Sequence, residues 1–205
     1  DVRGNGLVAT AHIDADPDDT YAVAFTNPVW RTVTSPAGTG LPVMDMGEIS
    51  RYNGTKDKTS SGSAAFIFSQ RFTTVRETFI VYADHPARIG ACFFGDSAKY
   101  QYLRGGGGTL FDTTYAKELC AADIYVDGET AEPTDVLQPG FHLLNFVPDE
   151  NTSVHYLARD RGLYGGSYMS GGCYVGEAFG FTNVLSSAKR EYLTRLLRWK
   201  WRGVG

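Results

Sequence analysis

The densest group of chemically active side chains in the 205-residue sequence is an acidic loop near the N-terminus. Asp14, Asp16, Asp18 and Asp19 place four carboxylates within six residues. Hard oxygen ligands of this kind are what Ca²⁺ takes from loops, although the central Gly and distant Glu of an EF-hand are absent. The loop therefore predicts a calcium site, and calcium is the one cofactor that the sequence suggests. The alternative is ordinary turn chemistry, in which Asp side chains cap backbone N–H groups.

Aromatic residues with polar or Gly neighbours form a second group of candidates. Proteins bind sugars by stacking aromatic rings on the apolar face of a pyranose, while a few amides and carboxylates bind its hydroxyls. For each of these residues the alternative is packing over a sheet edge or in the core. The candidate ligand-binding residues are Trp30, Tyr52, Tyr102, Tyr115, Tyr164 and Tyr168.

No catalytic constellation is recognisable in the sequence. A retaining glucanase needs carboxylates alternating along one strand, and no Glu is followed two positions later by Asp. The His residues form no metal-binding HExxH pattern, and no GxSxG nucleophile elbow occurs. His142 and His155 are expected on adjacent strands, where two satisfied imidazoles do not make a site. We therefore assign no catalytic residue and predict that the chain is not an enzyme.

Cys92, Cys120 and Cys173 are an odd set without CxxC spacing, which fits neither a disulfide framework nor a zinc site. At most one bridge can form among them. We expect each to be a buried thiol that behaves as a small hydrophobe.

The elements that must position these residues are mostly short strands. The chain holds 24 Gly, 13% aromatic and only 20% charged residues, and its β-branched and aromatic runs are separated by tight turns without helical crossovers. This pattern predicts an all-β fold, an antiparallel two-sheet jelly-roll sandwich.

Residues 1–205 are expected to form a single domain, excised from a longer protein because the chain begins at Asp1 rather than Met. The clearest strands are predicted at Ala64–Phe68, Glu77–Tyr82, Ala91–Phe94, Tyr100–Arg104, Asp123–Val126 and His142–Val147, with a hairpin turn at Asp127-Gly128 and a flexible loop at Gly105–Gly108.

One amphipathic helix is predicted at the C-terminus. Leu193, Leu196 and Leu197 recur at helical spacing after a Ser cap, and Trp199 and Trp201 are expected to pack with them. From Lys189 onward the segment carries six cations and one anion, a net charge of +5 in a chain of net charge −4. We interpret these cations as a solvated face that complements the helix dipole, with a binding site as the alternative.

The remaining chain is acidic and has no long apolar run. An overall charge of −4 gives no global field to attract phosphates, so nucleic acid is excluded as an expected partner. The longest apolar stretches are strand-sized, far from the ~20 residues that span a bilayer, and no membrane insertion is expected.

The C-terminal segment resembles a known family. Three consecutive segments are similar to the ending of laminin-G-like jelly-roll domains: the run Gly172–Phe181, the turn Leu185–Glu191 and the helix through Trp201. These domains belong to the concanavalin A-like lectin/glucanase superfamily. In their bacterial members a GxIGE strand precedes a turn and a short helix that ends in Lys-Trp. This resemblance implies that Glu177 accepts hydrogen bonds from nearby backbone or an Arg and holds strand to helix. Three upstream segments also resemble strands of that fold: Thr78–Tyr82, Asp123–Gly128 and Gly140–Phe146.

The resemblance also implies a function. Together with the aromatic loops and the missing catalytic motif, it predicts a non-catalytic carbohydrate-binding or adhesion module of a larger secreted or cell-surface bacterial protein. The expected partners are a glycan or an extracellular protein, and other domains of the same polypeptide. Two alternatives stay open: an architectural domain without a ligand, and a divergent glycoside hydrolase that lacks the usual carboxylate motif.

Overall fold

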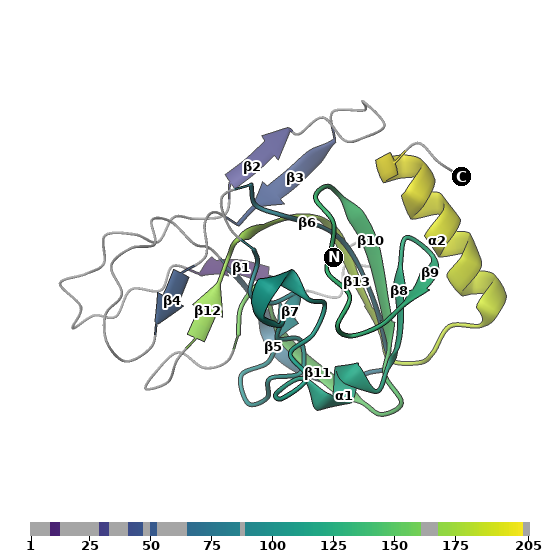
Figure 1. Cartoon of the computed structure of the whole chain (residues 1–205), viewed down its shortest axis with the longest axis horizontal. Coiled ribbons are helices and arrows are strands. Elements are labelled where there is room, and N and C mark those ends of the chain that lie inside the picture. The colour runs from purple at the N-terminus through teal and green to yellow at the C-terminus, as the bar shows by residue number, and fades with distance from the viewer. Residues whose placement is uncertain are drawn as a thin grey trace.

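The chain forms an antiparallel β-sandwich with one long helix on its outside (Figure 1). The computed structural model describes residues 9–12, 29–32, 41–46, 50–52, 65–86, 89–160 and 168–202. Within these ranges the fold is all-β, as predicted. Its two sheets have four and seven strands, and a two-stranded ribbon pairs β12 (Tyr168–Ser170) with β4 (Ser50–Tyr52).

The seven-stranded sheet has the order β2-β3-β13-β6-β10-β8-β9, and all its pairings are antiparallel. Its central strand β6 is buried on both faces, because Ile80 and Tyr82 point into the sandwich while Phe79 and Val81 point toward the helix. The bounds are β2 (Val29–Thr32), β3 (Pro42–Asp45), β6 (Glu77–Asp84), β8 (Asp123–Val126), β9 (Glu129–Ala131), β10 (His142–Val147) and β13 (Cys173–Phe181).

The four-stranded sheet covers the other side of the core. Its order is β1-β5-β11-β7, with β1 at Ala9–His12, β5 at Ala65–Val75, β11 at Thr152–Leu157 and β7 at Phe94–Gly95. Between the sheets, Phe93, Phe111 and Phe146 contact one another with ring centroids 4.9 to 5.8 Å apart. Edge-to-face and tilted pairs of this kind add to the stabilisation that comes from burying the rings.

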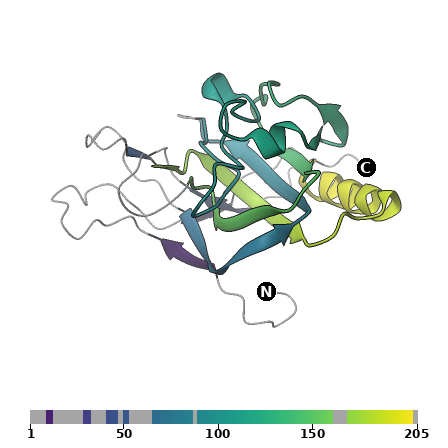
Figure 2. The same cartoon turned by 90° about the horizontal axis from the view of Figure 1, so that it is seen from below.

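The helix α2 (Ser187–Arg202) forms a third layer on the outer face of the seven-stranded sheet (Figure 2). Leu193, Leu197 and Trp201 recur every four residues and pack on Phe79, Val81 and Leu143. Trp201 therefore packs as predicted. Leu196 and Trp199, which were expected to pack with it, instead point outward and are 42% and 65% exposed.

A β-bulge in β13 adapts this sheet to the helix. Val175 pairs with Tyr82 and Ala178 with Ile80, so three positions of β13 span two of β6. Val175 and Ala178 both face the sandwich core, which leaves the intervening Gly176 and Glu177 on the helix side. The bulge places the Glu177 side chain where α2 can reach it, whereas regular alternation would turn it into the apolar core.

The local expectations were partly correct. The strands Asp123–Val126 and His142–Val147 have the predicted bounds. The Asp127-Gly128 turn is confirmed: both residues have positive φ, 55° and 89°, as a tight hairpin requires.

Two of the predicted strands, Ala91–Phe94 and Tyr100–Arg104, were wrong. Of Ala91–Phe94 only Phe94 belongs to a strand, β7, and Cys92 forms only an isolated bridge. Tyr100–Arg104 forms a turn with a single bridge between Cys92 and Leu103, not a strand. The Gly105–Gly108 loop includes a 3₁₀ turn, η1 (Gly106–Gly108), whose last carbonyl accepts a hydrogen bond from Arg104 at 2.8 Å. A short helix, α1 (Lys117–Cys120), was not predicted, because four residues show no periodicity.

The close approach of α2 to the bulge makes Gly176 sensitive to substitution. A Cβ at this position would lie 2.6 Å from the Trp201 ring, so Gly176→Ala must displace the end of the helix. We expect Gly176→Ala to lower the free energy of unfolding by about 1–3 kcal/mol in urea denaturation. Gly180→Ala on the same strand is the matched control, because its Cβ would meet only Val75 at 3.8 Å and should be neutral or slightly stabilising. Equal effects of the two substitutions would contradict this packing.

Candidate functional site

Tyr115 presents an aromatic ring at the surface, on a turn whose conformation is fixed. Its side chain is 53% exposed, and its ring lies 4.9 Å from the Tyr100 ring at an interplanar angle of 32°. The Asp112 carboxylate accepts hydrogen bonds from the backbone N–H groups of Thr114 and Tyr115, at 2.8 and 3.1 Å. We call Tyr100 and Tyr115 the tyrosine pair.

Charged groups come from the residues next to this pair in the chain. Lys99 precedes Tyr100, Glu118 lies in α1 three residues after Tyr115, and their side chains approach to 3.8 Å. Both side chains are about half exposed, so this ion pair contributes little to stability. An ammonium, a carboxylate and an exposed ring from two neighbouring segments are the groups that bind a polyhydroxylated ligand.

Tyr102 lies in the core, which corrects its prediction as a ligand-binding residue. Its side chain is 1% exposed, and its hydroxyl and that of Thr152 form a hydrogen bond of 2.9 Å. Burial raises the pKa of Tyr102 to about 12. The polar neighbour Arg104 made Tyr102 a candidate, but Arg104 is itself buried, with 4% of its surface exposed.

Three other predicted aromatic residues lie on described strands. Trp30 is in β2, while Tyr52 in β4 and Tyr168 in β12 are directly opposite each other in the two-stranded ribbon. Residues 52 and 168 are thus brought together from distant parts of the sequence. Tyr164 and the predicted calcium ligands Asp14, Asp16, Asp18 and Asp19 lie outside the described residues.

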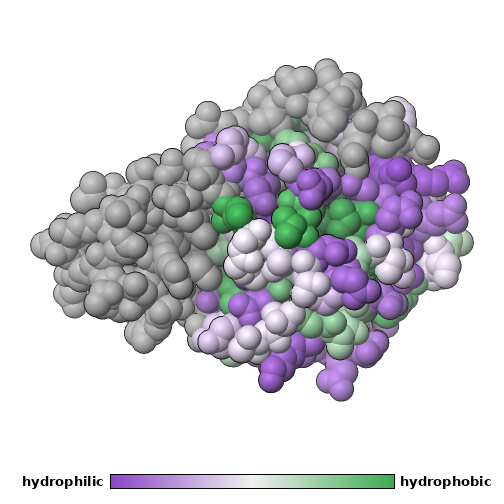
Figure 3. Space-filling model, viewed as in Figure 1, coloured by the Kyte–Doolittle hydropathy of each residue, from purple (hydrophilic) through white to green (hydrophobic). Residues whose placement is uncertain are grey.

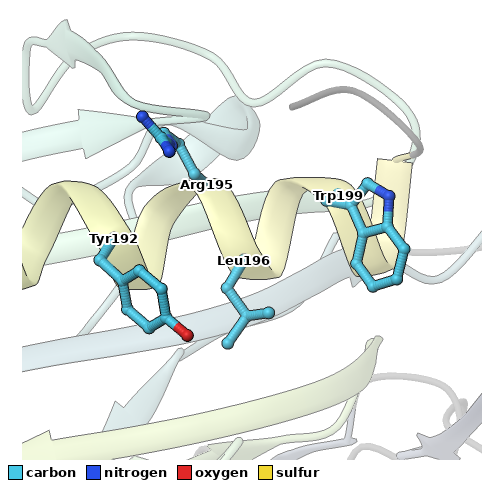
Figure 4. A pocket seen from close by; sticks show the side chains of 4 residues that line it. All are labelled: Tyr192, Arg195, Leu196 and Trp199. Atoms are coloured by element: carbon cyan, nitrogen blue, oxygen red, sulfur yellow. The ribbon is translucent and has the colours of Figure 1, made fainter.

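The outward face of α2 carries exposed apolar side chains that the sequence reasoning assigned to packing or did not single out. Tyr192, Leu196 and Trp199 project from the same side of the helix and, with Arg195, line an open hollow of about 490 Å³ (Figure 4). Tyr192 is 67% exposed. Hydrophilic side chains gather over the edge of the molecule where α2 lies (Figure 3). We call Tyr192, Leu196 and Trp199 the α2 crest.

Two buried or half-buried carboxylates hold α2 in place. Glu77, which is fully buried at the start of β6, accepts hydrogen bonds from Arg190 Nε at 2.7 Å, from Leu185 N–H at 2.7 Å and from Asn145 at 3.1 Å. Near the other end of the helix, Glu177 accepts a hydrogen bond from Trp201 Nε1 at 2.7 Å and forms an ion pair with Lys200 Nζ at 2.6 Å. The predicted strand-to-helix role of Glu177 is confirmed, although its partners are Lys and Trp side chains.

A third polar cluster lies on the sandwich side of the seven-stranded sheet. Arg104, which is 4% exposed, forms an ion pair with Asp84 and donates to the Tyr82 hydroxyl at 3.2 Å. The Asp84 carboxylate also accepts the backbone N–H of Gly90 at 2.9 Å. Burial raises the pKa of the Tyr82 hydroxyl, so the ring stays neutral beside this pair. The cluster ties the loops around Gly90 and Gly108 to the strand.

The two histidines do not lie on adjacent strands, which corrects that expectation. His142 is in β10 of the seven-stranded sheet, where its ring nitrogens contact the Asp127 carboxylate at 2.7 Å and the Gln138 carbonyl at 3.0 Å. His155 is in β11 of the other sheet and stacks on Tyr156 at 4.7 Å. Burial lowers the pKa of His155.

Two further kinds of feature are absent from the part of the chain that the structure describes. The described residues contain no group of three or more His, Cys, Asp or Glu arranged to hold a metal ion. Among the described helices, none has both the length and the apolar composition needed to cross a bilayer.

Comparisons of the chain with protein-family models, with curated proteins and with solved structures find no match. The resemblance to laminin-G-like domains therefore stays a prediction from the residues quoted for it.

The three cysteines form no disulfide, and their burial predicts different reactivities. Cys92 and Cys173 are buried, and burial raises the pKa of the Cys173 thiol. Cys120 is partly accessible, with a pKa raised by burial and by the charge of Asp112. Because the thiolate is the reactive form, we expect iodoacetamide at mildly alkaline pH to modify Cys120 slowly and the other two only after unfolding. Peptide mass spectrometry of the native protein measures this order, and prior labelling of Cys173 would contradict the buried position.

Proposed function

We propose that this chain is a non-catalytic binding module for a glycan, and that the tyrosine pair is part of its binding surface. The observation that carries the proposal is the exposed Tyr115 ring, 53% accessible on a turn fixed by Asp112. A ring held in place before binding loses little conformational entropy when a sugar stacks on it. The neighbouring Lys99 and Glu118 supply a donor and an acceptor for hydroxyl groups.

The resemblance to laminin-G-like domains supports the same function, since adhesion and carbohydrate binding are typical of them. It also supports the finer expectation of a module within a secreted or cell-surface protein.

Binding of the full chain to a glycan array, followed by titration calorimetry with the strongest soluble hit, tests this function. We expect Tyr115→Ala to weaken binding about fivefold, because stacking on an aromatic face is worth ~1 kcal/mol. Tyr115→Phe is the matched control, because it keeps the ring and removes only the hydroxyl. It should bind within about threefold of the unmodified chain, and thermal melting should show that both variants are folded.

The proposal would be overturned if no glycan on the array bound the chain above background and no extracellular protein bound it either. That outcome favours an architectural domain. Equal affinities of Tyr115→Ala and the unmodified chain would leave a glycan-binding module but remove the tyrosine pair from its site.

A further inference from the structure

The α2 crest is an exposed apolar ridge on a helix whose inner face is already buried. Tyr192, Leu196 and Trp199 follow one another at spacings of four and three residues, so their side chains align along the helix axis. From Tyr192 to Trp199 the crest extends about 10 Å, at ~1.5 Å per residue. Core packing does not account for this ridge, because Leu193, Leu197 and Trp201 already bury the opposite side of α2.

Cations lie on both sides of the crest. By helical geometry, Lys189 and Lys200 flank one side and Arg195 the other, and all three are exposed. Arg195 is 3.5 Å from Glu191, and Lys200 is held by Glu177, so each side chain is positioned close to the helix. The segment from Lys189 onward has a net charge of +5, whereas the rest of the chain has a net charge of −9.

From this arrangement we propose that the α2 crest and its flanking cations dock the protein on an anionic lipid surface, with the helix lying parallel to the membrane and without spanning it. Trp and Tyr favour the membrane–water interface because each combines an apolar ring with a polar atom. Lys and Arg beside them attract anionic headgroups. A ridge of three aligned side chains on one straight helix can contact a plane at all three points at once, and a bilayer surface offers that plane.

The charge distribution also sets the orientation of the docked protein. The acidic remainder of the chain is repelled by anionic headgroups, so α2 is the element that can approach them most closely. The same charges oppose a symmetric dimer through this face, because the cations that flank one crest would meet those that flank the other. An acidic protein is the remaining alternative partner of the α2 crest, and the vesicle experiment described next distinguishes it from an anionic lipid surface. This inference does not depend on the proposed glycan binding.

Flotation of the full chain with lipid vesicles tests the proposal. Vesicles of phosphatidylcholine alone are compared with vesicles in which about one lipid in three is phosphatidylglycerol. We expect binding to the anionic vesicles only, weakened by salt. The double variant Tyr192→Ala/Trp199→Ala should lose about tenfold or more in affinity, and Lys189→Glu should lose several-fold.

Val136→Ala is the matched control, because Val136 is also an exposed apolar residue, 52% accessible, but lies outside α2. It should bind vesicles as the unmodified chain does. Intrinsic tryptophan fluorescence gives a second readout, since burial of Trp199 in the interface should shift its emission to shorter wavelength. No binding to anionic vesicles, equal binding to neutral ones, or binding unaffected by the double variant would each overturn the proposal. Sedimentation that shows self-association abolished by the double variant would assign the crest to a protein contact and overturn it as well.

Discussion

The fully buried carboxylate of Glu77 is the constraint on which the arrangement of sheet and helix depends. A charge in an apolar interior is costly unless hydrogen bonds and an opposite charge compensate it. Here the compensation comes from three separate elements: Asn145 on β10, the N–H of Leu185 before the helix, and the guanidinium of Arg190 within it. All three must be in place together, so the start of α2 has one well-defined position on the sheet.

The other end of the helix is fixed by a different device. The bulge in β13 turns Glu177 out of the core and toward Lys200 and Trp201, while Gly176 leaves room for the indole ring. Between these two anchors the inner residues of α2 pack against β6, and the α2 crest must face outward. The same contacts that stabilise the fold therefore set the orientation of the surface that we propose for lipid docking.

How much of this structure could be predicted from the sequence depended on how far apart in the chain the interacting residues lie. Alternating and β-branched runs gave strands such as Asp123–Val126 correctly, and helical periodicity located α2. The same periodicity could not tell which side of the helix the sheet would cover, so Trp199 was assigned to packing. The partners of Glu77 lie up to 113 residues away in the chain, and no local pattern identifies them. For the tyrosine pair, the exposed Tyr115 was identified, but the ring contact with Tyr100 requires the loops to fold together.

Amide hydrogen exchange of Glu77→Gln tests most directly whether the buried Glu77 carboxylate fixes α2 on the sheet. This variant keeps the shape of the side chain and removes its charge, at an expected cost of about 3 kcal/mol. We expect amides in the middle of α2 to lose protection while those of β6 and β10 keep most of theirs. Unchanged protection of α2, in a variant that unfolds at the same denaturant concentration as the unmodified chain, would contradict this role of Glu77.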